Sequence, residues 1–76
     1  MTDNMTENTS DKQNVHIVPH DEGWAVKTEN SDRAVKVHDT QEDAITHGKE
    51  LAQKRESELI IHGRDGQIRE RFSYVS

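Results

Sequence analysis

Two segments with the alternation of β-hairpins flank one segment with helical spacing, and this arrangement limits the possible folds more than any other feature. The first runs from Val15 to Lys27 and the second from Glu58 to Tyr74. Between them, residues 39–55 carry apolar side chains at the i, i+3/i+4, i+7 positions of a helix face. At 76 residues the chain has room for one small domain. We expect a single α+β domain, ordered β-β-β-α-β-β, with one helix packed on one face of a mainly antiparallel sheet.

Residues 1–13 differ in composition from the rest of the chain. They are polar and acidic, with Met1 and Met5 as their apolar side chains. Such a segment buries too little apolar surface to offset the entropy of ordering, so we expect a disordered tail over 1–13 and the domain over 14–76. The sequence contains neither a signal-peptide pattern nor an apolar run long enough for a membrane helix. We therefore expect a cytoplasmic protein with no membrane partner.

The first three strands are predicted from turn signals. Pro19 is expected to end the first strand, because proline cannot donate a hydrogen bond to a sheet. Gly23 is free to take a positive φ in the turn that follows. Trp24 begins an alternating segment, and residues 33–38 form another. Short turns between them predict an antiparallel meander, with Trp24 packed in the core.

The helix has clear boundary signals. Thr40 is a good N-cap, with Asp43 as the acidic partner of a capping box, and basic residues occupy the last turn. Gly48 costs about 1 kcal/mol in a helix interior relative to alanine, which indicates that the helix lies close to the sheet there. We expect Leu51 to be the centre of the buried stripe. The helix is able to return the fourth strand to either edge, so the strand order stays open.

The last hairpin is indicated by the tight-turn sequence at 63–66, which contains Asp-Gly. On the strand that follows, alternation predicts that Ile68, Phe72 and Tyr74 share one face. Arg69 and Arg71 would then point together toward the other face.

Three segments of the chain resemble a known family. They read V-H-I-V-P-H-D-E-G-W-A-V-K, V-H-D-T-Q-E-D-A-I and I-I-H-G-R-D-G-Q-I-R-E-R-F-S-Y. Together they are similar to the short bacterial proteins called domain of unknown function 2188, over Val15 to Tyr74. The resemblance implies a bacterial cytoplasmic protein and carries no activity or functional residue. A looser likeness links G-W-A-V-K and R-A-V-K-V-H-D-T-Q-E-D-A to the DNA arm-binding modules of tyrosine recombinases. Those modules tend to be basic, whereas this chain has a net charge of −5.

The candidate binding residues are Arg64, Arg69 and Arg71, with Lys27 expected nearby. Guanidinium groups suit bidentate contacts to phosphate, so these residues could form an anion-binding or nucleic-acid-binding surface. The alternative is that they pair with Glu58, Glu70 or Glu29 across the sheet. We favour pairing, because an acidic domain repels a polyanion.

Histidines provide a second set of candidates. His16, His38 and His62 fall on different predicted strands, and His20 lies in a turn beside Asp21. Histidines with a carboxylate could hold a zinc or nickel ion, but the usual ligand spacings are absent, so we expect surface histidines and no cofactor.

Catalysis is not expected. His20, Asp21, Asp65 and Ser73 supply acid-base groups and a hydroxyl, but no catalytic motif contains them. We also expect a domain of this size to have little room for the ~300 Å³ pocket of a small-molecule site.

These observations favour a non-enzymatic protein-binding or adaptor module, including self-association through a sheet edge. Nucleic-acid binding through the Arg64, Arg69 and Arg71 hairpin is the alternative, followed by a histidine-based metal site.

Overall fold

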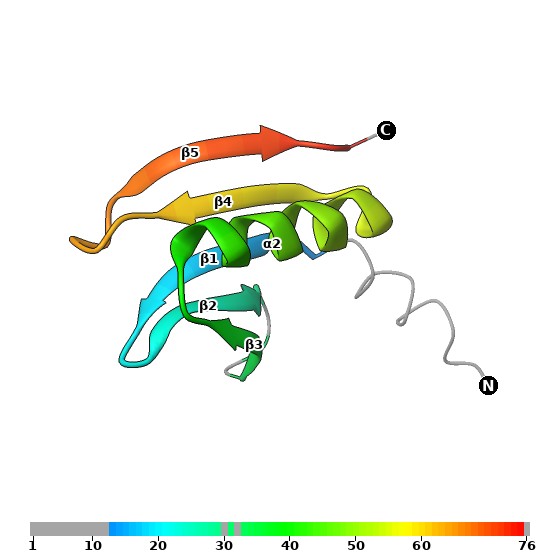
Figure 1. Cartoon of the computed structure of the whole chain (residues 1–76). Coiled ribbons are helices and arrows are strands. Elements are labelled where there is room, and N and C mark those ends of the chain that lie inside the picture. Colours follow the sequence, from blue (N-terminus) through cyan, green and yellow to red (C-terminus); the bar gives the residue numbers. More distant parts are fainter. Residues whose placement is uncertain (1–12, 30, 32, 76) are drawn as a thin grey trace.

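The computed structural model describes residues 13–29, 31 and 33–75. Nearly all of the predicted tail therefore lies outside the described residues. Within the described part, one helix packs on a five-stranded sheet, which confirms the predicted α+β class and the order β-β-β-α-β-β (Figure 1). The elements are β1 (Val15–His20), β2 (Gly23–Thr28), β3 (Ala34–His38), α2 (Gln41–Arg55), β4 (Glu58–His62) and β5 (Ile68–Ser73).

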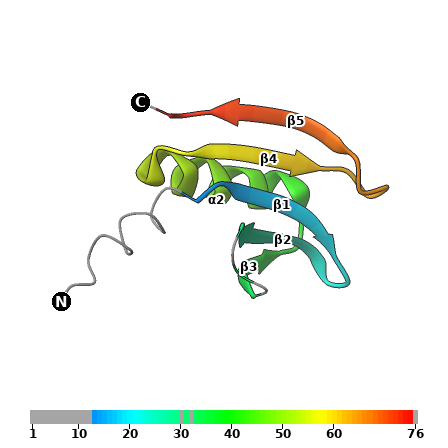
Figure 2. The same cartoon turned by 180° about the vertical axis from the view of Figure 1, so that it is seen from behind.

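The strand order, which the sequence left open, is β3-β2-β1-β4-β5. The first three strands form the predicted antiparallel meander, and β4 and β5 form an antiparallel hairpin. The strand pair β1–β4 is parallel, because α2 crosses the sheet and places β4 beside β1. The sheet is therefore mixed. Seen from behind, the face away from α2 carries no helix from the described residues (Figure 2).

Helix α2 begins and ends as its sequence predicts. The Thr40 side-chain oxygen accepts a hydrogen bond from the Asp43 backbone N–H at 3.1 Å, which confirms the N-cap. At the other end, Glu56 takes a left-handed conformation with φ 55°, and its N–H caps the last carbonyls. These contacts satisfy backbone groups that a helix end otherwise leaves without partners.

The core lies between α2 and the three middle strands of the sheet. Gly48 is the point of closest approach: a Cβ built there would lie 2.7 Å from Ile17 Cδ1 and 2.8 Å from Leu59 Cδ1. The expectation that Leu51 is the centre of the buried stripe is wrong. Leu51 is only half-buried, because small residues occupy the centre of the stripe: Ala44, Gly48 and Ala52.

The first strand continues past Pro19, contrary to the predicted stop. Pro19 pairs with Trp24, and β1 extends to His20. The parallel pairing with β4 involves only Val15 to Ile17, so the proline lies where one side of β1 has no neighbouring strand. A proline is tolerated at such a position, because no partner strand there needs its N–H.

The predicted alternation along β5 fails because of a β-bulge. Ile61 pairs with Glu70, whereas the next residue, His62, pairs with Ile68. Arg69 is therefore the extra residue, and a bulge of this kind reverses the faces of the residues beyond it. As a result, Ile68 is 53% exposed instead of packing with Phe72.

Candidate functional site

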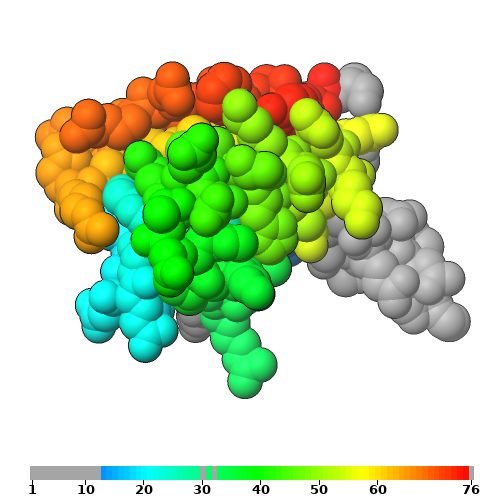
Figure 3. Space-filling view, in the orientation of Figure 1, coloured from blue at the N-terminus to red at the C-terminus, as the bar shows by residue number. Residues whose placement is uncertain are grey.

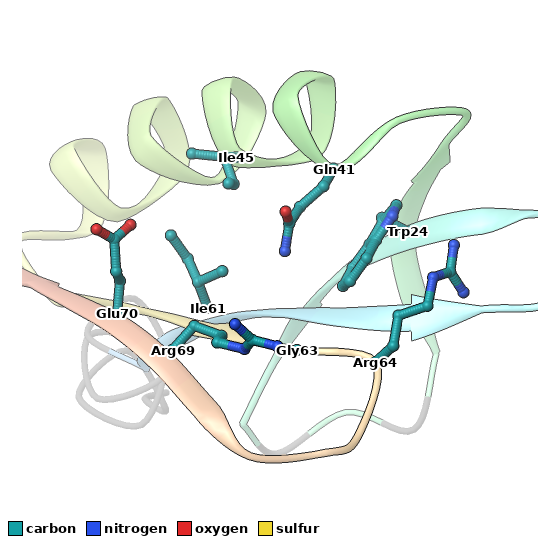
Figure 4. Close-up of a pocket in the computed structure, with 8 residues that line it drawn as sticks. All are labelled: Trp24, Gln41, Ile45, Ile61, Gly63, Arg64, Arg69 and Glu70. Carbon is teal, nitrogen blue, oxygen red and sulfur yellow. The ribbon is translucent and has the colours of Figure 1, made fainter.

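A groove of about 480 Å³ lies between the start of α2 and the β4–β5 hairpin. We call it the hairpin groove. Its apolar base is formed by Trp24, Ile45 and Ile61, from three different elements (Figure 4). We expected a domain of this size to have little room for a pocket of ~300 Å³, and the volume of this groove is larger than that. Figure 3 shows the hairpin (orange) beside the helix residues (green) that cover the middle of the sheet.

The hairpin that forms one wall is held by its own hydrogen bonds. The Gly63 N–H donates to the Gln67 carbonyl at 2.8 Å, and the Gly66 N–H donates to the Gly63 carbonyl at 2.9 Å. The Asp65 carboxylate accepts from the Gln67 N–H at 3.1 Å. Gly66 has a positive φ of 85°, as Asp-Gly turns favour. These hydrogen bonds define the turn, and the turn positions the backbone of Arg64 and Arg69 beside the groove.

Both Arg64 and Arg69 line the hairpin groove. The Arg64 guanidinium lies 4.9 Å from the centre of the Trp24 ring, a cation–π contact. Trp24 itself is only 7% exposed, which confirms its place in the core. Arg69 packs against Gly63, where a Cβ would come within 2.5 Å of its Nε. Neither arginine forms an ion pair within the part of the chain that the structure describes.

The four predicted binding residues divide between two faces of the sheet. The bulge turns Arg69 toward the helix side, so the expectation that Arg69 and Arg71 point the same way is wrong. Arg71 lies on the opposite face, where its Nε is 3.5 Å from the Glu58 carboxylate. This contact is one of the cross-strand pairs that the sequence suggested. Lys27 is also on that opposite face, in the row that joins His16, Ile60 and Arg71 across the sheet.

A second groove of about 360 Å³ lies on the face away from α2, and we call it the histidine groove. Lys27 and Glu29 line it together with His16 and His62. The His16 Nδ1 atom is 3.0 Å from His62 Nε2, and its Nε2 atom is 3.3 Å from the Glu29 carboxylate. Parallel pairing of β1 with β4 brings these two histidines together. The pKa of Glu29 is lowered, mainly because the Asn14 amide donates a hydrogen bond to its carboxylate.

The other histidines have separate contacts. His38 reaches across to helix α2, where its Nε2 lies 3.0 Å from His47 Nδ1. His20 accepts a hydrogen bond from the Glu22 N–H within its own turn. Among the described residues, no group of three or more His, Asp or Glu side chains is arranged to hold one metal ion.

Three of the four groups considered for catalysis, His20, Asp65 and Ser73, take part in local hydrogen bonds. The Asp65 carboxylate accepts within the β4–β5 turn, and the Ser73 hydroxyl accepts from the Val75 N–H at 3.5 Å. His20 is engaged in the β1–β2 turn. Within the described part of the chain, no hydrogen bond or ion pair joins these three side chains.

Sequence reasoning missed several residues of both grooves. Gln41 and Ile45 belong to the hairpin groove, and Glu29 and Ser31 belong to the histidine groove. Gln41 had a usable signal, because the first residue of a capped helix lies at the helix end beside the sheet. For the others the signal would have been the strand order, which the sequence left open.

The fold and its grooves define a small α+β domain with one helix on a five-stranded mixed sheet. The chain belongs to a family described as an uncharacterized protein conserved in bacteria, DUF2188, whose model matches residues 15–74. A curated relative is the uncharacterized protein YdaT of Bacillus subtilis (strain 168), 38% identical over 57 residues. The match covers 75% of this chain and 38% of the relative, so the chain spans about two fifths of that protein's length. No solved structure gives a significant match.

Helix α2 is neither long nor apolar enough to cross a membrane, and the described residues contain no other candidate span.

Proposed function

We propose that this domain is a non-enzymatic protein-binding module and that its partner occupies the hairpin groove. The observation that carries the proposal is the combination of an apolar base with a polar and charged rim in one groove. Trp24, Ile45 and Ile61 form the base, whereas Arg64 and Arg69 lie at the rim. Protein interfaces commonly combine an apolar centre, often with an aromatic residue and arginine, with a polar surround.

The proposal that the domain is not an enzyme rests on the contacts of the candidate acid-base side chains. Two of the candidate acid-base groups, His20 and Asp65, are engaged in turn hydrogen bonds. The hairpin groove itself holds one carboxylate, from Glu70, and no histidine from the described residues. A paired acid and base, or a nucleophile with its base, is therefore missing from the groove as described.

Site-specific crosslinking tests the proposal in the native cytoplasm, where we also propose that the protein acts. A photo-crosslinking amino acid replaces Gln41 in the hairpin groove and, in a second variant, Lys27 on the opposite face. We expect a discrete protein adduct from position 41 and none from position 27. Nuclease treatment should leave that adduct intact. Fractionation of the cells checks the location.

A matched pair of helix variants shows whether the groove itself binds. The partner, identified by mass spectrometry and purified, is titrated against Ile45→Glu and Thr46→Glu. Ile45 lines the groove, whereas its neighbour Thr46 is exposed and lies outside it. Binding should be lost in the first variant and kept in the second, with circular dichroism confirming that both fold. Adducts from position 27 alone, or adducts removed by nuclease, would contradict the proposal.

A further inference from the structure

The two halves of the sheet meet at a short join that carries a pair of histidines. The halves are the β1–β2–β3 meander and the β4–β5 hairpin, and within the sheet they meet where β1 pairs with β4. This parallel pairing spans three residue pairs. On the face away from α2, His16 of β1 contacts His62 of β4 across the join. We propose that the His16–His62 pair is a pH-sensitive switch, which stabilises the join with at most one added proton and weakens it with two.

The geometry of the pair limits how many protons it can hold. His16 Nδ1 lies 3.0 Å from His62 Nε2, within hydrogen-bond distance, and the ring centres are 5.2 Å apart. One of these two nitrogens has to accept, and a nitrogen that accepts carries no hydrogen. When both rings are protonated, both nitrogens carry a hydrogen, so the hydrogen bond is lost and two positive charges lie side by side.

Glu29 favours the first proton. Its carboxylate lies 3.3 Å from His16 Nε2, the nitrogen that faces away from His62. A protonated His16 can therefore donate to Glu29 through Nε2–H and to a neutral His62 through Nδ1–H. The Asn14 amide donates to the same Glu29 oxygen at 3.1 Å, and its own oxygen accepts from the Glu58 N–H at 2.9 Å. The first proton is thus held in a network of side chains that crosses the join.

The surrounding charges do not compensate for a second proton on His62. From β2, Lys27 lies directly opposite His16 and adds another positive charge. From β4 and β5, Glu58 and Arg71 pair with each other. Within the part of the chain that the structure describes, His62 forms no ion pair. The histidine contact is also partly buried, so water screens the repulsion less than it would at a fully exposed site.

The limit on protons makes the stability of the fold depend on pH. In the unfolded chain the two histidines protonate independently, so in acid they bind two protons where the folded pair holds one. A folded state that binds one proton fewer loses stability as the pH falls, by at most about tenfold in the unfolding constant for each pH unit. Histidine changes charge between about pH 5 and 8, which is therefore the range of the switch.

A histidine titration by NMR on the full chain tests the limit directly. The carbon-bound imidazole protons report the charge of each ring as the pH is lowered. We expect His16 and His62 to take up their protons in two separate steps, as interacting groups do. In His62→Gln, whose amide can donate to His16 but takes up no proton, His16 should titrate in one step. Simultaneous protonation of both rings in the unaltered chain would overturn the proposal.

Urea unfolding at about pH 7 and about pH 5 measures the consequence. Between these values, the unfolding constant should rise at least about threefold more in the unaltered chain than in His62→Gln, because the variant has no second proton to exclude. His20→Asn is the matched control: His20 lies on the same strand as His16 but outside the pair, so this variant should keep the full loss. The His38–His47 contact is present in all three chains, so its own response to acid cancels in the comparison.

Each remaining outcome decides the proposal. If His62→Gln loses as much stability in acid as the unaltered chain, the switch is rejected, even where the rings titrate in two steps. If His62→Gln does not fold, His16→Gln replaces it, because it also removes one of the two protons and leaves an amide that can donate to Glu29. The same reduction in acid sensitivity is expected there, and its absence would reject the switch. No binding partner enters these measurements, so their result leaves the proposed function untouched.

Discussion

At the scale of single residues, the turn glycines have unequal roles. Gly23 has φ 137° and Gly66 has φ 85°, so both adopt backbone conformations that favour glycine. Only Gly23 is also crowded: a Cβ there would collide with the His38 carbonyl oxygen, whereas none of the described atoms lies within 4 Å of one at Gly66. At Gly23, both backbone strain and steric overlap therefore disfavour any other residue. At Gly66, backbone strain alone does so.

We expect Gly23→Ala to lower the free energy of unfolding by at least about 3 kcal/mol, because backbone strain and steric overlap add. The control is Gly66→Ala, which should cost only about 1–2 kcal/mol, the penalty of a left-handed conformation. Urea unfolding of both variants measures the difference. Equal losses would mean that the β2–β3 contact at His38 is not tight.

The lowered pKa of Glu29 gives a pH dependence of known sign. A carboxyl group with a lower pKa in the folded state stabilises the protein at pH values above its unfolded-state pKa of 4.5. This stabilisation is lost as the pH falls through the folded-state pKa. Because the side chain is 41% exposed, we expect a small effect. Glu29→Gln should reduce stability at pH 7, and the difference from the unaltered chain should shrink as the pH falls below 4.5, in thermal melts across this range. Glu50→Gln, on the exposed helix face, should show no such convergence.

At the scale of elements, the helix and hairpins were predictable and their relative placement was not. Thr40 and Gly63–Gly66 carry local signals that act within a few residues, and the structure confirms both. The bulge at Arg69 depends on how β4 and β5 pair, and nothing in the local sequence marks it. Hence Arg69 was placed on the wrong face. The His16–His62 contact depended on the strand order, which alternation cannot set.

The core positions provide a test of how α2 meets the sheet. Leu59 is fully buried beneath Gly48, whereas Leu51 is only half-buried at the edge of the core. We expect Leu59→Ala to cost about 2–5 kcal/mol and Leu51→Ala distinctly less, since the cost of a cavity depends on burial. Chemical denaturation gives both values. The reverse order would mean that α2 is rotated relative to the sheet.

The histidine pair between β1 and β4 allows a direct metal test. Glu29 contacts His16 but approaches from the nitrogen that faces away from His62. We expect equimolar zinc to leave the melting temperature unchanged, because two imidazoles provide fewer ligands than zinc usually takes from protein. Binding at one hundred times the dissociation constant would instead add ~2.7 kcal/mol. A saturable rise that His62→Ala removes and His47→Ala retains would establish a metal site.

At the scale of the whole molecule, charge sets the expected response to nucleic acids. The basic candidates lie on two faces, and the chain carries a net charge of −5. We expect no binding to DNA or RNA at low salt in fluorescence anisotropy. Arginine–phosphate contacts would give a salt slope of about −0.7 to −0.9 per contact. Micromolar binding at physiological salt, abolished by replacing Arg69 and Arg71 with alanine, would reverse this conclusion.

The parallel contact between β1 and β4 also has a consequence for the order in which the molecule is built. The Glu58 N–H donates to the Asn14 side chain at 2.9 Å, although the two residues are 44 positions apart in the chain. During synthesis, β1, β2, β3 and α2 all leave the ribosome before β4 does. Until β4 is made, the edge of β1 that pairs with β4 has no partner strand. Closing so long a loop is slow relative to forming a hairpin. The meander and helix can therefore assemble early, but the finished sheet forms only once its last hairpin has been made.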